Sequence, residues 1–562
     1  MSLNTTIEAA ANSPRDLAPE KPEAVPGAPP IERWLHGHLT KIAVAITAGA
    51  FAARIVVASR SYLNPDEALH YLLLNEPSLF LAYKASLTNA HPPLIYLLLY
   101  ICHFVSHSEL MLRLPSILAG TAFCWFTFKW IRTLFGEAAG LIAVILAAFS
   151  PTLIALSAEV REYALLLCCM AAALYFLERA FAQKSVGTMW LFSLCLYLAI
   201  LSHYSAAFFC LAAGVYALAR ISDSGYPRKI ISAWVIGQMG ALTIYVFLYV
   251  THLSKIRNNL AVWGTAFGGT FYRFDQESIF HFTKQNTWNI FQFLFAQPYV
   301  AGTMLIGFVA GTGFLLLKDF MPSAGRGAPR HASIYVLLPF FAVWAAAVAG
   351  IYPYIGSRHT AVLIPSAIAA ASFLFASVSR QKLLAGALLA SLLIGVSNYY
   401  GKCPEPGIRD VDQRQALMTG AMNYLHQSMR EDDVILADMQ SSMPLGYYYC
   451  GAEEAFFTSW TRASFDQFRC HGHLIVSLHF WLLRPEGLTV PFEKMVNSYG
   501  LKPGDRVWIF QAGWGGDLIA ELPKEAAKFQ CLTPRTFGQN ITIVPLMVGS
   551  DLSPAPQTKC VN

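Results

Sequence analysis

Long apolar runs, separated by short polar connections, dominate the first 400 residues of the chain. Most of the runs approach the ~20 residues that an α-helix needs to cross a bilayer. They predict a polytopic α-helical membrane domain over residues 36–400 with about 11–13 spans, in which the short run at 94–106 does not make a simple crossing. The runs recur at about 40–58, 94–106, 110–131, 138–156, 163–178, 188–201, 204–219, 231–250, 299–317, 332–352, 359–378 and 383–400.

The pattern changes after Gly401, where short apolar stretches alternate with longer amphipathic ones. This alternation is typical of strands that alternate with helices, and it predicts a C-terminal α/β domain over residues 401–562 with a mostly parallel sheet. The expected strands lie at 434–437, 473–478, 507–510 and 541–544, and the expected helices at 412–430, 491–499 and 516–522. The Gly-rich turn at 513–517 is interpreted as ordinary turn and capping chemistry.

Composition supports a membrane protein. Hydrophobic residues make up 55% of the chain and charged residues only 13%, whereas soluble domains carry roughly 25% charged residues. The formal net charge of +6 does not indicate nucleic acid, because the basic residues lie in short loops between apolar runs. The expected surroundings are a lipid bilayer. Residues 1–35, which begin rich in Ala, Pro and Glu, are interpreted as a disordered cytoplasmic tail rather than a signal peptide.

The lysines and arginines fall in alternate loops, which sets the expected orientation. The positive-inside rule places those loops, and the amino terminus, in the cytoplasm. The other side then carries a first outer loop at 60–93, the long loop at 251–298 and the C-terminal domain. We expect a multi-pass membrane protein with its first outer loop and C-terminal domain on the non-cytoplasmic side, which in a bacterial inner membrane is the periplasm.

The first outer loop, residues 60–93, holds an acidic pair, Asp66 and Glu67, followed by His70 and by His91 before two prolines. Asn64-Pro65-Asp66-Glu67 is also a typical helix start, with a capping residue, a proline and acids in the first turn. Carboxylates at a membrane surface are costly unless they have a task. Both interpretations hold together, because a helix start is a rigid mount for a general base or a metal ligand. Asp66, Glu67 and His91 are the possible ligands if a divalent metal binds.

Other polar residues map to the same side. Arg161 and Tyr163, with Glu159 and Glu162 as neighbours, form either a salt-bridged turn or a phosphate contact. Arg358 either anchors a helix or clamps a phosphate bidentately. The helix start after His91 presents unpaired N–H groups that attract phosphate. We therefore expect the phosphate of a ligand to bind Arg161, Arg358, His91 and Tyr163. Supporting positions are His70, Lys84, His203, Tyr204 and His359.

The order of these features resembles a known family. An apolar helix, the DEALHY loop, HPPL, the RLPS segment at Arg113–Ser116 and REY at 161–163 resemble the GT-C superfamily of integral-membrane glycosyltransferases. The nearest branches are protein O-mannosyltransferase-like enzymes, including lipid A aminoarabinose transferases and galacturonosyltransferases of lipopolysaccharide core. The resemblance covers roughly residues 40–380. The C-terminal α/β domain varies across the family and says little about the acceptor.

The resemblance implies a specific reaction. A polyprenyl-phosphate-linked sugar donor would transfer its sugar, with inversion, to an envelope glycan, glycolipid or protein on the periplasmic face. Asp66 matches the family's base, and Glu67 lies beside it. A general base contributes about 10²–10⁴-fold, and fixed cations around the leaving phosphate often contribute more.

A membrane transporter or flippase for a lipid-linked or anionic substrate is the alternative. Transporters usually place polar residues in mid-span, often at broken helices. In this chain the charged residues gather at the ends of spans on one side, which favours the enzyme.

Cysteines divide into two groups. Six fall in apolar runs and are interpreted as small core residues. The other five, Cys403, Cys450, Cys470, Cys531 and Cys560, follow the last apolar run. An oxidising periplasm would allow at least one disulfide among these five, and Cys450–Cys470 is the preferred pair because it flanks a short loop-rich stretch.

Overall fold

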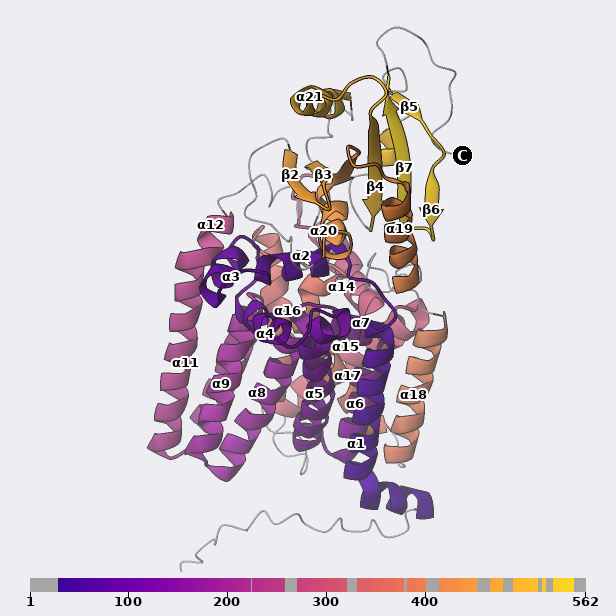
Figure 1. Cartoon of the computed structure of the whole chain (residues 1–562). Helices are drawn as coiled ribbons and strands as arrows, with labels where there is room; N and C mark the ends of the chain where they lie inside the picture. Colours follow the sequence, from indigo (N-terminus) through magenta and orange to yellow (C-terminus); the bar gives the residue numbers. More distant parts are fainter. Residues whose placement is uncertain are drawn as a thin grey trace, which may run out of the picture.

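The computed structural model has two parts, a bundle of long helices and an α/β domain that sits on one end of it (Figure 1). It describes residues 29–223, 225–257, 270–320, 331–378, 382–400, 414–451, 465–478, 489–513, 518–521 and 529–549. Most of the predicted tail and the end of the Gly-rich turn lie outside these residues. The tail prediction is wrong at its end, because helix α1 already begins at Pro30.

Within the described residues, 8 helices are long and apolar enough to cross a membrane. They are α1 (Pro30–Ala58), α5 (Glu109–Phe135), α8 (Tyr163–Gln183), α10 (Ala206–Asp223), α11 (Arg228–Leu248, continued by the π-helix η1, Tyr249–Leu253), α15 (Pro298–Phe320), α17 (Ile364–Val378, preceded by the 3-10 helix η2, Arg358–Leu363) and α18 (Lys382–Tyr400). Two shorter apolar helices, α9 (Val186–Ser202) and α16 (Ala332–Val348), run beside them in Figure 1. The polytopic helical fold with a C-terminal sheet domain is confirmed. The expected 11–13 spans exceed the 8 long helices that the described residues contain, or 9 if the bent pair Glu137–Phe149 and Pro151–Ser157 counts as one span. The numbers differ because α4 (Leu94–His103), α9 and α16 are too short to meet the same length.

A broken helix lies inside the bundle. α6 (Glu137–Phe149) and α7 (Pro151–Ser157) meet at an angle of 60°, because proline cannot continue the hydrogen-bond ladder of α6. The break frees carbonyl groups at the end of α6. The buried guanidinium of Arg54 satisfies two of them, donating from Nη1 to Ala148 O over 3.0 Å and from Nη2 to Ala147 O over 3.4 Å. Arg54 therefore has a structural task in the bundle.

The outer end of the bundle is built from short helices. α2 (Pro65–Leu74), α3 (Leu79–Ser86) and α4 (Leu94–His103) form the first outer loop, and α4 is too short to span a membrane, as expected. The long outer loop expected at 251–298 is partly wrong. It contains α12 (Ser254–Arg257) and α14 (Ile279–Phe295), and the latter buries Phe291 and Leu294 against the bundle.

The C-terminal domain holds a mixed sheet rather than a mostly parallel one. Its strands lie in the order β2-β3-β1-β4-β7-β5, with β6 also paired to β7. β1 pairs in parallel with β3 and with β4. The pairs β2–β3, β4–β7, β5–β7 and β6–β7 are antiparallel. The elements are α19 (Gln415–Ser428), β1 (Val434–Asp438), α20 (Met439–Tyr448), β2 (Phe465–Cys470), β3 (His473–Leu478), α21 (Thr489–Tyr499), β4 (Arg506–Ala512), α22 (Leu518–Glu521), β5 (Phe529–Cys531), β6 (Arg535–Phe537) and β7 (Ile541–Val548).

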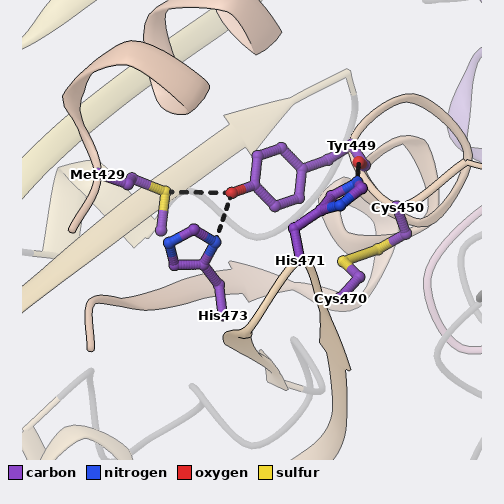
Figure 2. The surroundings of a disulfide bond; sticks show 6 residues. All are labelled: Met429, Tyr449, Cys450, Cys470, His471 and His473. Atoms are coloured by element: carbon purple, nitrogen blue, oxygen red, sulfur yellow. Dashed lines mark hydrogen bonds between the residues drawn. A yellow bond between two sulfur atoms is a disulfide. The ribbon is translucent and has the colours of Figure 1, made fainter. Parts of the chain in front are cut away.

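A disulfide joins Cys450, just after α20, to Cys470 at the end of β2, as predicted (Figure 2). The strands β2 and β3 turn through His471 and Gly472, whose φ angles of 50° and 83° suit a tight hairpin of type I′. His471 Nε2 donates to Tyr449 O over 2.8 Å, because a carbonyl can only accept. The hairpin and the end of α20 are therefore linked by a covalent bond and a hydrogen bond.

The C-terminal domain docks on the first outer loop through α20, which lies over α2 (Figure 1). Gly446 faces the side chain of Leu72 so closely that an added Cβ would lie 3.2 Å from it. Gln415 N donates to Arg60 O over 3.0 Å at the start of α19. The outer domain thus contacts the loop that carries Asp66.

Candidate functional site

The start of α2 is fixed by Glu67. Asn64 and Glu67 form a capping box, in which each side chain accepts from the other residue's backbone N–H over 3.0 Å. The same carboxylate accepts from Arg113 Nε and Nη2, both at 2.8 Å, and from Val160 N at 2.8 Å. Glu67 is 1% exposed and has both oxygens occupied. It is therefore a positioning residue, and Asn64 and Glu67 together cap the helix start that the sequence predicted at Asn64-Pro65-Asp66-Glu67.

Arg113 extends this arrangement to the end of α1. Its Nη1 donates to Ala58 O and Ser61 O over 2.6 and 2.7 Å, and its Nη2 donates to Tyr62 O over 3.0 Å. A buried guanidinium with this many partners holds the chain between α1 and α2 in one path. The RLPS segment therefore supports the acidic pair across 46 residues of sequence.

Asp66, next to Glu67, faces two guanidiniums. Its Oδ2 lies 2.6 Å from Arg358 Nη2 and 3.3 Å from Arg161 Nη2, and its side chain keeps 23% exposure. Burial alone would raise the pKa of the Asp66 carboxyl, but Arg161 and Arg358 outweigh burial and hold that pKa well below its usual range. Asp66 is thus an ionised, partly accessible carboxylate.

Histidines surround Glu162 beside this pair. His91 Nδ1 lies 3.1 Å from Glu162 Oε1, and His70 Nε2 lies 3.6 Å from Glu162 Oε2. His70 Nδ1 donates to Asp66 O over 2.7 Å. The ring of His203 lies 5.9 Å from that of His91, and burial lowers the pKa of His203 to about 4. His203 is therefore a neutral imidazole near pH 7.

Tyr163 lies between His203, His359 and Arg161. Its ring centroid lies 5.2 Å from that of His203 and 6.5 Å from that of His359, and the Arg161 guanidinium lies 5.7 Å from it. Ser116 Oγ donates to Arg161 O over 2.8 Å and fixes the turn before α8. Segments far apart in sequence thus meet in one cluster.

The cluster contains most, but not all, of the residues that the sequence suggested. Lys84 lies apart on α3, 4.5 Å above the Phe80 ring. Tyr204 points to His252, with Oη 2.6 Å from Nδ1. Glu162 entered the prediction only as a neighbour of Arg161, and Arg113 only as part of a motif. Brought together are Asp66, His70, His91, Arg161, Tyr163, His203, Arg358 and His359.

The C-terminal domain reaches this site through one tyrosine of α20. Leu63 N donates to Tyr448 Oη over 2.6 Å, and the Tyr448 hydroxyl donates to Glu109 Oε1 over 2.7 Å. Glu109 Oε2 in turn lies 3.8 Å from Arg113 Nη1. A chain of polar contacts therefore runs from the outer domain to Glu67.

Known proteins share the fold of this chain. A model of the family described as dolichyl-phosphate-mannose-protein mannosyltransferase matches residues 90–254. The structure of ArnT from Cupriavidus metallidurans bound to undecaprenyl phosphate superposes with a TM-score of 0.51 at 14% identity, over 92% of this chain and 99% of that one. The chain has a GT-C glycosyltransferase fold. The predicted resemblance to this class of membrane glycosyltransferases is confirmed.

Two further solved structures match with TM-scores below 0.5. The Archaeoglobus fulgidus oligosaccharyltransferase is 11% identical with a TM-score of 0.41, over 70% of this chain and 58% of that one. The arabinofuranosyltransferase AftD from Mycobacteria is 12% identical with a TM-score of 0.47, over 91% of this chain and 40% of that one. No curated protein sequence matches the chain.

Proposed function

We propose that this GT-C chain transfers a sugar from a polyprenyl-phosphate donor to an envelope acceptor on the periplasmic face of the membrane, with Asp66 as general base. The observation that carries the proposal is the ionised Asp66 carboxylate between Arg161 and Arg358 at the outer end of the bundle. The ArnT structure of the same fold is bound to undecaprenyl phosphate, which supports a polyprenyl-phosphate ligand here.

The two arginines suit the leaving group. When the bond between the anomeric carbon and the phosphate oxygen breaks, the electron pair goes to the lipid phosphate, whose negative charge grows. Guanidiniums bind phosphate in a bidentate manner and stabilise the charge that develops there. Arg161 and Arg358 are held near each other by one shared carboxylate oxygen, so they are positioned before a donor arrives.

Asp66 can accept a proton from the acceptor hydroxyl, which is the nucleophile. The acceptor hydroxyl attacks the anomeric carbon from the face opposite the phosphate, which inverts the configuration, and its proton passes to the carboxylate. A phosphate bound to the same arginines would add negative charge near Asp66. This charge would raise the low pKa of Asp66 and make it a stronger base in the donor complex. His91 and Tyr163 lie close enough to support the phosphate or the sugar.

The disulfide supports the choice of membrane face. Disulfides persist in oxidising compartments such as the periplasm, and Cys450–Cys470 lies in the domain that docks on the loop of Asp66. The transport alternative receives less support, because this charged cluster lies where α2, α8, α9 and α17 begin or end, rather than in mid-span.

The test compares envelopes from cells that lack the chain with envelopes from cells that carry the wild type or Asp66→Asn. We expect mass spectrometry of glycolipids, polysaccharides and glycoproteins to find one sugar missing without the chain. Asp66→Asn should fold, because Glu67 and Asn64 cap the helix, and should lose at least ~10² in turnover. Asp275→Asn, at an exposed position of the membrane domain, is the matched control. Normal glycosylation with Asp66→Asn would refute Asp66 as the base.

A further inference from the structure

Three side chains near Arg161 and Arg358 have potential metal-binding atoms close to one another. The ligand atoms of His91, Glu162 and His203 all lie within 4.8 Å of one another. They come from the first outer loop, the turn before α8 and the turn after α9. His91 Nδ1 and Glu162 Oε1 are already 3.1 Å apart, close to the roughly 3.4 Å that separates two ligands of a tetrahedral zinc ion with bonds of about 2.1 Å.

Glu162 lacks the partners that a buried carboxylate normally has. It is 0% exposed, and its oxygens face the imidazole nitrogens of His91 at 3.1 Å and His70 at 3.6 Å, whereas no described N–H that must donate is hydrogen-bonded to them. Glu67, equally buried, accepts from Arg113 and from two backbone N–H groups. Burying a carboxylate without strong donors costs free energy, so a cation close to both oxygens would stabilise Glu162.

The tautomer of His70 strengthens this requirement. Its Nδ1 must carry the hydrogen, because its partner, the Asp66 carbonyl at 2.7 Å, can only accept. In the neutral ring, Nε2 then points a lone pair at Glu162 Oε2, 3.6 Å away. Nε2 is fully buried and has no hydrogen-bond partner among the described residues. Two lone pairs that face each other indicate a cation, either a proton or a metal ion.

The surroundings suit metal-binding histidines. Ser205 N donates to His203 Nδ1 over 3.1 Å, and Ser205 Oγ lies 2.8 Å from the same nitrogen, so this turn fixes the orientation of the ring. A metal ion on Nε2 would take the place of the hydrogen there, and the remaining ring hydrogen would then lie on Nδ1, where Ser205 Oγ can accept it. Arg161, on the same turn, opposes a further positive charge, whereas Glu159 and Glu162 on either side of it offset that charge. The two neighbouring turns therefore supply both an orienting hydroxyl and a compensating charge.

We propose that His91, Glu162 and His203 bind one divalent transition-metal ion of the Zn²⁺ class, with Nε2 of His70 facing the remaining position. Two imidazoles and one carboxylate form a ligand set that zinc takes with an open coordination position, and imidazole favours zinc over magnesium or calcium. The ion would tie the first outer loop to the starts of α8 and α10. It would also hold the turn of Arg161 in place, and it does not depend on the sugar or the acceptor.

The experiment measures metal in the full-length chain, purified in detergent without a polyhistidine tag. We expect about one Zn²⁺ per chain by elemental mass spectrometry after chelation, reloading and dialysis. Co²⁺ loaded instead should give the visible absorption of a tetrahedral site. His91→Ala and His203→Ala should lower the bound metal about 10-fold or more, whereas His281→Ala, at an exposed position of α14, should keep it.

A second measurement covers variants that fold poorly. Glu162→Gln preserves size and removes the charge, so Zn²⁺ should raise the Tm of the wild type and leave that of Glu162→Gln unchanged. Wild type that binds no more Zn²⁺ than His91→Ala, and whose Tm Zn²⁺ does not change, would overturn the proposal. A proton shared between His70 and Glu162 would then be the cation. Because metal content is read without any transfer reaction, a failure here is distinct from a failure of the proposed activity.

Discussion

Arg358 donates from Nη2 to Oδ2 of Asp66 over 2.6 Å, although 292 positions separate the two residues in the chain. Arg161 Nη2 approaches the same oxygen at 3.3 Å. One carboxylate oxygen therefore holds two guanidiniums at the outer end of the bundle. An anionic ligand can replace Asp66 as their counter-ion, and this exchange underlies the first prediction.

Arg358→Gln and Arg161→Gln should each weaken the binding of polyprenyl phosphate. Loss of a charge-assisted hydrogen bond costs about 1.5–3 kcal/mol, or roughly 10- to 150-fold in affinity. Native mass spectrometry or a competition assay with the purified chain measures this affinity. Lys84→Gln serves as the control, because Lys84 lies over Phe80 and away from Asp66. Unchanged affinity in both arginine variants, with the fold intact, would place the phosphate site elsewhere.

The ion pairs of Asp66 should make a pH-dependent contribution to stability. The pKa of Asp66 is lowered in the folded chain relative to about 3.9 in the unfolded one, so its contribution is present above the unfolded value and is lost as pH falls through the folded value. The difference in Tm between wild type and Asp66→Asn should therefore stay constant from about pH 5 to 8 and shrink below about pH 4. A difference that changes near pH 6–7 would show that the pKa is raised instead.

The central residues are predictable from the sequence because each lies in a recognisable local setting. Asp66 stands at a helix start after an apolar run, and Arg161 and Arg358 each precede a span on the same side. The predicted orientation of the spans therefore places these three residues on the same side of the membrane. Glu162 was harder to interpret, since its neighbours His91 and His203 come from turns that only the packing of α4, α8 and α9 brings together.

Tertiary pairing explains the wrong predictions. Residues 279–295 carry Thr, Lys, Gln and Asn among their apolar positions, so the periodic signal of α14 was too weak to separate from a loop. The alternation of strands with helices predicts a mostly parallel sheet, but β7 returns antiparallel to β4. The role of Arg113 depends on Glu67, 46 residues away, and no local pattern encodes that contact.

The disulfide gives a prediction for the outer domain. Cys450 and Cys470 are 20 residues apart, and closing a loop of this length stabilises a domain by about 3 kcal/mol in the chain-entropy model. Cys450→Ser with Cys470→Ser should therefore make the C-terminal domain more sensitive to limited proteolysis. Cys195→Ser, at a free cysteine of the membrane domain, should not. Thiol labelling of the denatured, unreduced wild type should leave both Cys450 and Cys470 unlabelled, and labelling of either one would contradict the pairing.

Tyr448 should couple the C-terminal domain to the site. Its hydroxyl accepts from Leu63 N and donates to Glu109, so Tyr448→Phe leaves a buried N–H and a carboxylate oxygen with one partner fewer. Such a loss costs about 1–3 kcal/mol, part of which should appear as displacement of the loop before Asp66. We expect a lower Tm and a lower transfer rate with donor affinity nearly unchanged, because Arg161 and Arg358 are untouched. Tyr399→Phe, at an exposed position of α18, is the control. If Tyr448→Phe lowered Tm without any change in transfer rate, the tyrosine would only stabilise the domain contact and would not position Asp66.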